Sequence, residues 1–311
     1  MNTALESVLA RLDWMHDEGL WPDGKRHLWT DAWGVVLYVT LFEETGNERW
    51  LDTAEALVAE VERVLGRPRG LRIGEGPDRE GQYYHYLAMW AFALQRLGRH
   101  RPAHHGRAIE LVRSVHPRFV VPGVGVVWKM SDDLSASCPG FGLGTIDPFH
   151  GYVVYRLIDE VELAGEIAHL AQLVERCYPS LHIEQDLGLG LMLWISHVFP
   201  DEPWARVQRA RSLHTLDAMW VEPPGYFSRG PQQPETHFAF TNHGVSVGLQ
   251  SIGVWPQRVA ALRRYFDSYR SHDRYDIDPI THVMACTARL PGAMLERATA
   301  PADHAVEGGV R

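Results

Sequence analysis

Apolar residues recur at helical spacing along most of this chain, and they fall into two kinds of segment. Segments such as residues 31–44 and 81–97 are apolar on nearly every side. Residues 49–65 instead carry one apolar stripe, with Leu51 and Val58 on the same face. A helix that is apolar all round is buried, whereas a one-sided helix covers a core. The pattern therefore predicts inner helices, each covered by an outer helix.

The two kinds of segment alternate along the chain. Inner helices are expected at residues 31–44, 81–97, 147–159, 186–198, 242–252 and 279–290. Outer helices are expected after the first five of these, at residues 49–65, 102–115, 163–177, 203–219 and 256–271. The amphipathic N-terminal segment, residues 1–20, can supply the sixth outer helix by closing a ring. This count predicts an all-α fold, an (α/α)6 toroid, with an open α-solenoid as the alternative.

The links between helices are uneven in length. Turns from inner to outer helices are short, whereas links from outer to inner helices are long and hold most of the unusual residues. The link at residues 116–146 contains an alternating, Gly-containing stretch, residues 119–128, that predicts a small β-hairpin. We expect one toroid domain over residues 1–290 and a flexible C-terminal tail over residues 291–311.

Acidic, amide and imidazole side chains mark the starts of the inner helices. Asp147 precedes Pro148, a typical arrangement for a helix cap and first turn. Asp31, Asn242 and Asp278 hold similar positions. In a toroid these starts share one end of the ring, where free N–H groups and the helix dipoles add positive potential. We expect that end to hold the active site.

The architecture resembles the six-hairpin glycosidase superfamily, over residues 1 to about 290. The segment Ile146-Asp147-Pro148-Phe149-His150 is similar to the one that carries a catalytic Asp in unsaturated glucuronyl hydrolases. Sugar 2-epimerases and polysaccharide lyases have related toroids. The Trp-x-Arg-Gly-x-Gly-Trp motif usual in the glucuronyl hydrolases is absent from this chain. The resemblance implies a carbohydrate-active enzyme.

Paired carboxylates at such a site can hydrolyse a glycosidic bond, one as acid and the other as base or nucleophile. A carboxylate at a helix start suits the second role, because the helix dipole favours its ionised form. The acid would then come from a link. We predict Asp31, Asp147 and His243 as catalytic residues. The predicted substrate-binding residues are Trp33, Glu75, Asp78, Glu80, Tyr84, His85, His150, Glu235, His237, Asn242, Asp278 and His282.

Each of these residues also has a structural interpretation. The aspartates can be simple caps, each worth about 1 kcal/mol. A histidine on an inner helix can be a satisfied core group, and most of the aromatic residues can be core. Four histidines near four helix starts, namely His85, His150, His243 and His282, favour the functional interpretation.

The leading hypothesis is a glycoside hydrolase acting on a small saccharide. One alternative is a sugar isomerase or 2-epimerase with His243 and His282 as paired bases, since His can donate and accept protons near neutral pH. Another is a polysaccharide lyase using Asn242, His243 and a tyrosine. A non-catalytic helical scaffold is the third alternative.

The charge and composition of the chain argue against several classes of binding partner. The net charge is −9, without a Lys/Arg run, which argues against nucleic acid or a membrane surface as a partner. Cys138, Cys177 and Cys286 are widely spaced and form no CxxC pair, which argues against a zinc knuckle, and their odd number suits a reducing compartment. We expect no cofactor and no metal, with a metal held by the helix-start histidines and Asp31 or Asp147 as the alternative. The N-terminal segment lacks the pattern of a signal peptide, and no apolar run reaches about 18 residues. We therefore expect a cytoplasmic protein whose partner is a small saccharide.

Overall fold

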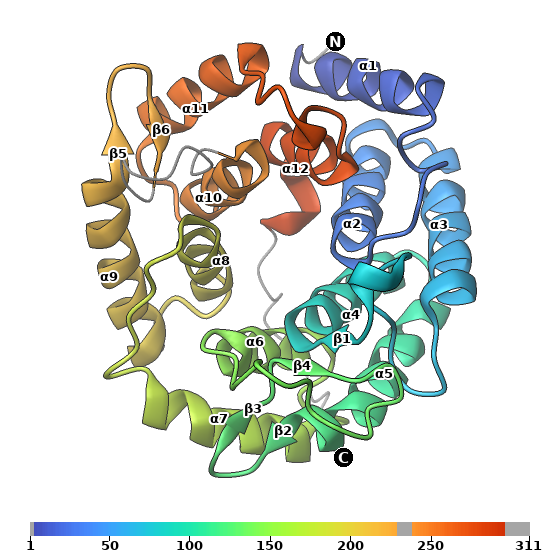
Figure 1. Ribbon diagram of the computed structural model, residues 1–311, viewed down its shortest axis with the longest axis vertical. Coiled ribbons are helices and arrows are strands. Elements are labelled where there is room, and N and C mark those ends of the chain that lie inside the picture. Colours follow the sequence, from blue (N-terminus) through green and yellow to red (C-terminus); the bar gives the residue numbers. More distant parts are fainter. Residues whose placement is uncertain (1–2, 229–237, 296–311) are drawn as a thin grey trace, which may run out of the picture.

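A computed structural model describes residues 3–228 and 238–295, and its helices form a closed double ring (Figure 1). The inner ring consists of α2 (Leu28–Thr45), α4 (Tyr84–Gly98), α6 (Asp147–Ile158), α8 (Asp186–Ser196), α10 (Ala239–Ser251) and α12 (Pro279–Arg289). The outer ring consists of α1 (Thr3–Asp17), α3 (Arg49–Leu65), α5 (Ala103–Phe119), α7 (Ala164–Cys177), α9 (Pro203–Met219) and α11 (Pro256–Ser268). The predicted all-α (α/α)6 toroid is confirmed.

Burial follows the pattern of apolar positions. Every residue of α2 from Leu28 to Leu41 is buried, whereas α3 buries only the stripe that contains Leu51, Val58 and Leu65. The ring closes because α12 packs against both α2 and α1. The first helix therefore completes the outer ring, and the open solenoid is ruled out.

Glycines set the closest approach within the inner ring, between α8 and α10. A Cβ added at Gly248 would lie 2.3 Å from the carbonyl oxygen of Gly190. A Cβ at Gly190 would lie 2.7 Å from the carbonyl oxygen of Gly244. Only glycine lets the two backbones approach this closely, which accounts for the Gly-rich sequence of both helices.

Three small antiparallel pairs of strands lie in the links. β2 (Val120–Val121) pairs with β3 (Gly125–Val126), which confirms the predicted hairpin. β5 (Trp220–Val221) pairs with β6 (Tyr226–Phe227). β1 (Gln82–Tyr83) pairs with β4 (Lys129–Met130), which the sequence pattern did not predict. This last pair attaches the long link to the start of α4.

The packed chain continues past the expected domain boundary at residue 290. Ala293 and Met294, in the short 3-10 helix η3 (Gly292–Met294), are fully buried. The indole Nε1 of Trp194 donates a hydrogen bond of 2.7 Å to the carbonyl oxygen of Met294. Residues 296–311 of the expected tail lie outside the described residues. No helix in the described part of the chain is long and apolar enough to cross a membrane.

Candidate functional site

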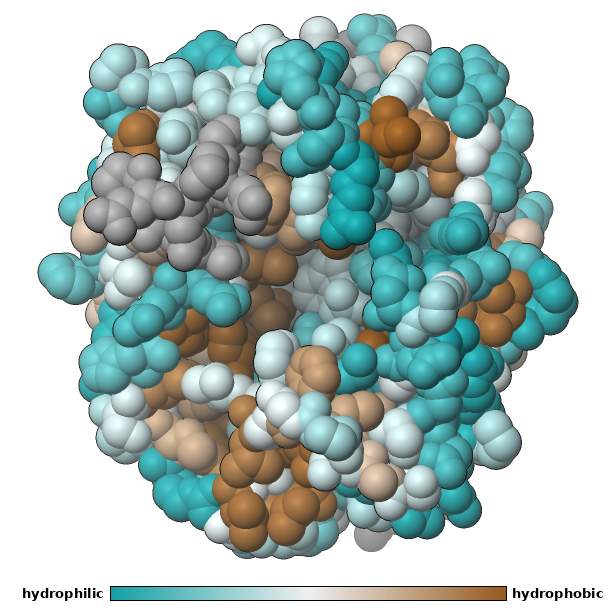
Figure 2. Space-filling model, in the orientation of Figure 1, coloured by the Kyte–Doolittle hydropathy of each residue, from teal (hydrophilic) through white to brown (hydrophobic). Residues whose placement is uncertain are grey.

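A cavity of about 620 Å³ opens at the end of the ring where the inner helices begin. Figure 2 shows this face of the molecule hollowed near the ring axis. The polar side chains that line the cavity are those of Thr145, His85, Asp147, His150, His182, Glu184 and Gln185. Its aromatic walls come from Trp29, Tyr86, Trp128 and Phe240. A volume of this size suits a small ligand.

The carboxylate of Asp147 faces this cavity instead of capping α6. The N-cap position of α6 is held by Ile146, so Asp147 is the first residue of the helix and not its cap. Its Oδ1 lies 3.6 Å from Nδ1 of His85 and has no hydrogen-bond partner among the described residues. A side chain at Gly144 would overlap the other carboxylate oxygen. The expected cap is therefore not formed, and the glycine leaves room for the carboxylate to turn towards His85.

His85 is positioned by the first turn of α4 and by a ring of aromatic side chains. The backbone N–H of Tyr84 donates to the carbonyl oxygen of Trp128 at 3.2 Å, which fixes the start of the helix. The rings of Trp29 and Tyr86 lie 5.7 and 4.7 Å from the imidazole, centroid to centroid, both edge-on. These contacts direct Nδ1 towards Asp147 and leave Nε2 for another partner.

His150 supplies a second imidazole to the same cavity, from the first turn of α6. Its side chain is fully buried, and neither ring nitrogen has a hydrogen-bond partner within the described residues. Burial, with a smaller contribution from the nearby His85, lowers the pKa of His150 to about 3. The ring is therefore neutral at physiological pH and can donate one hydrogen bond and accept another. Buried polar groups nearly always have partners, so this one points to a bound molecule.

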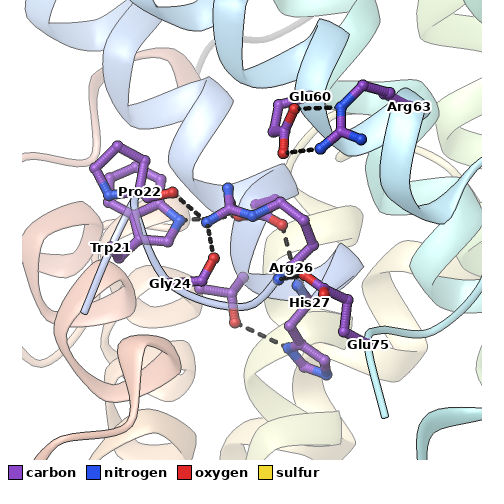
Figure 3. Close-up of polar contacts among 10 residues, drawn as sticks. Trp21, Pro22, Gly24, Arg26, His27, Glu60, Arg63 and Glu75 are labelled. Atoms are coloured by element: carbon purple, nitrogen blue, oxygen red, sulfur yellow. Dashed lines mark hydrogen bonds and ion pairs between the residues drawn. The ribbon is translucent and has the colours of Figure 1, made fainter. Parts of the chain in front are cut away.

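Asp31 lies behind the cavity and not in its lining. Its carboxylate accepts hydrogen bonds from Trp21 Nε1 at 2.9 Å, Arg26 Nη1 at 3.2 Å and the backbone N–H of His27 at 3.1 Å. Burial raises the pKa of Asp31 to about 6, while Arg26 opposes that rise, so the group is ionised at neutral pH. Figure 3 shows Arg26 reaching the carbonyl oxygens of Pro22 and Gly24 as well.

Glu75 belongs to the same structural network, because its Oε1 accepts the backbone N–H of Arg26 at 2.7 Å (Figure 3). Asp78 and Glu80 are exposed in and beside the 3-10 helix η1 (Pro77–Arg79), and Glu80 lies 3.5 Å from Arg72. None of these three link carboxylates lines the cavity. Glu235 and His237 lie outside the described residues.

Other predicted site residues are structural in this fold. Asp278 caps α12 by accepting the N–H of Ile280 at 3.3 Å. The amide of Asn242 makes two hydrogen bonds with the backbone of Phe227, so it anchors β6. Trp33 and Tyr84 are core residues, and neither lines the cavity. Asn242 is therefore not free for the role that the lyase alternative gives it.

His243 and His282 do come together, but in a different place. Both line a second cavity of about 370 Å³, between α1 and the ends of α10, α11 and α12. The four histidines predicted to share one face are thus divided into two pairs.

Sequence reasoning missed the contribution of the links to the central cavity. Trp128 is 40% exposed and stands in the lining, while His182, Glu184 and Gln185 come from the link before α8. The only signal for Trp128 in the sequence was its place as the last residue of the predicted hairpin segment, residues 119–128. Within residues 3–228 and 238–295, no group of three or more His, Cys, Asp or Glu side chains could hold a metal ion.

No family model matches this sequence, and no curated protein does. Solved structures match it closely in shape. A D-mannose isomerase aligns with a TM-score of 0.68 at 10% identity, over 94% of this chain and 97% of that chain. A cellobiose 2-epimerase from Bacillus thermoamylovorans B4167 aligns with a TM-score of 0.66 at 11% identity, over 94% of this chain and 100% of that chain.

A third match is an α-1,6-mannanase, GH76A of Salegentibacter sp. HEL1_6. Its TM-score is 0.59 at 11% identity, over 94% of this chain and 100% of that chain. That structure is an inactive variant, with two consecutive aspartates replaced by asparagine, in complex with α-1,6-mannotriose. The three matches confirm the fold resemblance to the six-hairpin glycosidase-like toroids.

Proposed function

We propose that this protein is a carbohydrate-active enzyme that moves a proton at the carbon next to a sugar carbonyl, as an aldose–ketose isomerase or a 2-epimerase does. One observation carries the proposal: the His85–Asp147 pair and the neutral imidazole of His150 face one cavity. The fold shared with a D-mannose isomerase and a cellobiose 2-epimerase supports the same class of chemistry.

The roles follow from the geometry. With Nδ1 of His85 facing Asp147, Nε2 is the atom that would take the proton from C2 of the open-chain sugar. The carboxylate of Asp147 stabilises the imidazolium that forms. His150 donates a hydrogen bond to the carbonyl oxygen as negative charge develops there, in a buried setting where such a bond is strong. Delivery of that proton to C1, while the proton of the C2 hydroxyl passes to the former carbonyl oxygen, gives isomerisation. Protonation of C2 on its opposite face by a second donor, with His85 losing its proton to solvent, gives epimerisation.

This assignment revises the two-carboxylate mechanism expected from the sequence. That mechanism needs a second carboxylate beside Asp147, and Asp31 is fully engaged by Trp21, Arg26 and His27 outside the cavity lining. The alternative that uses His243 and His282 as bases has a similar difficulty. Both residues line the second cavity, away from Asp147. His85 and His150 take their place.

A glycoside hydrolase remains the second candidate, because Glu184 lines the same cavity as Asp147. It could act as general acid in a carboxylate pair. The consecutive aspartates that matter in the mannanase variant have no counterpart in the cavity lining. The only such pair in this chain is Asp132-Asp133. Asp132 accepts the N–H of Gly81 at 2.5 Å, and Asp133 holds the hydroxyls of Ser131 and Ser135.

Proton NMR in D2O tests the choice, with D-mannose, D-fructose, cellobiose and α-1,6-mannobiose as substrates. The proposal predicts solvent deuterium at C2 or C1 of the sugar, with the glycosidic bonds intact. His85→Gln should abolish the exchange and Asp147→Asn should slow it strongly, while Asp78→Asn, an exposed carboxylate outside the cavity, should not change it. New reducing ends without exchange, lost in Glu184→Gln, would instead establish the hydrolase. Exchange that survives in His85→Gln would overturn the proposed base.

A further inference from the structure

The second cavity lies where the toroid closes on itself. α1 contributes Arg11 and Trp14 to its lining, α10 contributes His243, and α12 contributes Thr281. Its volume of about 370 Å³ falls within the range of small-molecule sites. The proposed proton-transfer chemistry uses none of its residues.

Two polar side chains in this lining lack partners. His243 is only 9% exposed, and its ring lies 5.6 Å from that of Phe266, centroid to centroid, but has no hydrogen bond with any described residue. The hydroxyl oxygen of Thr281 is buried and equally unpaired in the part of the chain that the structure describes. Native proteins satisfy the great majority of buried hydroxyls, so the unpaired hydroxyl of Thr281, in the same cavity as the imidazole of His243, indicates that a ligand completes its hydrogen bonds.

Guanidinium groups with spare donors border the same space. Arg270 makes one hydrogen bond, from Nη1 to the carbonyl oxygen of Tyr269 at 2.7 Å, and the structure shows it no carboxylate partner within the described ranges. Arg11 has only a long contact, 3.8 Å, with Oδ1 of Asp267. Five donors in a fixed fork make a guanidinium well suited to a carboxylate or a phosphate.

The carboxylates close to the cavity are already engaged. Asp276 accepts the backbone N–H groups of Ser271 and His272, at 2.7 and 2.8 Å, and the hydroxyl of Ser271 at 2.8 Å. Both oxygens of Asp267 accept from Nη2 of Arg289, at 2.5 and 2.6 Å. The unused hydrogen-bonding capacity is therefore that of cationic and neutral donors, which favours an anion.

Aromatic rings form the walls. Phe238 and Tyr275 pack 4.6 Å apart, centroid to centroid, and Trp14 lies 4.7 Å from the ring of His282. All four of these residues line the cavity. Flat apolar faces of this kind pack against a ring, whether aromatic or a sugar.

We propose that this cavity is a second binding site, which takes a small ring compound carrying a carboxylate or phosphate group. Arg11 and Arg270 hold the anionic group, the aromatic walls enclose the ring, and His243 and Thr281 bind its substituents. Because α1, α10, α11 and α12 all contribute, an occupied site joins the first helix to the last ones.

Isothermal titration calorimetry tests the site with four probes: glucose 6-phosphate, 4-hydroxybenzoate, inorganic phosphate and glucose. Binding of either ring-bearing anion is expected, and which of the two binds distinguishes a sugar phosphate from an aryl carboxylate. Phosphate alone and glucose alone should bind more weakly, since each offers half of the contacts. Failure of both ring-bearing anions to bind would overturn the proposal.

Matched variants locate the binding. Arg270→Gln should weaken it by roughly tenfold, the usual order for a lost charge-assisted hydrogen bond. Arg264→Gln, an exposed arginine on α11 that lies outside the lining, should have no effect. Equal weakening by both variants would show non-specific attraction and overturn the site.

Asp147→Asn should leave the affinity of these anions unchanged, since the two cavities are separate. If Asp147→Asn or Trp128→Ala removes the binding, the ligand occupies the central cavity, and the second site is overturned. The proposed proton transfer is unaffected by either result, because its own test uses neutral sugars.

Discussion

Nδ1 of His85 lies 3.6 Å from Oδ1 of Asp147, and the two side chains come from consecutive inner helices, α4 and α6. Neither residue is near the other in sequence, so only the ring brings them together. An imidazole with a carboxylate on one nitrogen and a cavity on the other is poised to act as a general base.

Asp147→Asn should lower kcat for C2 proton exchange by roughly 100-fold, because the imidazolium of His85 loses its charged partner. KM should change little, since the amide keeps the shape of the carboxylate. Steady-state kinetics followed by NMR exchange in D2O gives both constants. A large rise in KM at constant kcat would instead assign Asp147 to substrate binding alone.

Trp128→Ala should raise KM for the sugar by roughly three- to tenfold, with kcat nearly unchanged, because an aromatic face that stacks on the substrate is lost. The indole is held in the lining by the rings of Tyr83 and Phe141, at 5.7 and 5.5 Å. Trp14→Ala is the matched control, since Trp14 is 37% exposed but lines the second cavity. An equal effect of both variants would argue for general destabilisation.

Asp31→Ala should destabilise the fold by about 3–5 kcal/mol, because it leaves Arg26 buried without its carboxylate. Urea unfolding measures the loss, and kcat per folded molecule should stay close to that of the wild type. Asp23→Ala, at an exposed position in the link between α1 and α2, should have little effect on either quantity. If Asp31→Ala removes activity without lowering stability, Asp31 is catalytic after all.

His150→Gln should make the stability of the protein less sensitive to acid. The folded state holds the pKa of His150 at about 3, below the usual 6.5, so the unfolded chain binds a proton first as the pH falls. Stability from this group is complete above pH 6.5 and is lost between pH 6.5 and 3, at about 1.4 kcal/mol per pH unit. Urea unfolding at pH 7.5, 6 and 5 measures the slope. His182→Gln, an exposed histidine in the same cavity, should leave the slope unchanged.

Gly248→Ala should cost about 1–3 kcal/mol, because its new methyl group would meet the backbone of Gly190 and force α8 and α10 apart. Gly106→Ala should instead stabilise by about 0.5–1 kcal/mol, because that helical position on α5 has open space around it. Thermal unfolding of the two variants compares them directly. Similar changes in melting temperature for both variants would show that the close approach of α8 and α10 does not account for the cost.

The ring could be predicted from the sequence because burial in it is periodic and local. Each outer helix shows its buried stripe, and each inner helix is apolar throughout, so the pairs can be counted directly. Because an inner helix is apolar on all sides, its sequence does not indicate which way a polar side chain on it points. His85 and His243 sit near similar helix starts, yet one faces the ring axis and the other faces the outer layer, because an all-round apolar helix has no preferred side.

Helix boundaries explain the other differences at the site. α2 and α10 begin three residues earlier than expected, at Leu28 and Ala239. That shift places Asp31 and Asn242 about 4.5 Å deeper along their helices, inside the wall and not at the open end. α6 begins at Asp147 as expected, and its carboxylate does reach the cavity. The contribution of Trp128 depends on the β1–β4 pairing between distant segments, which no local pattern reveals.

The pairing of α1 with α12 has a consequence for how the molecule is made. Five hairpins consist of helices that follow each other, so each can form as soon as it leaves the ribosome. The sixth pair joins α1 to α12, a helix completed only at residue 289. During synthesis α12 is made last, so the surfaces that it covers stay exposed to water until then. They are the apolar stripe of α1, with Val8 and Met15, and the side of α2 that faces α12. Nascent chains are therefore at greatest risk of aggregation just before α12 packs against α1 and α2.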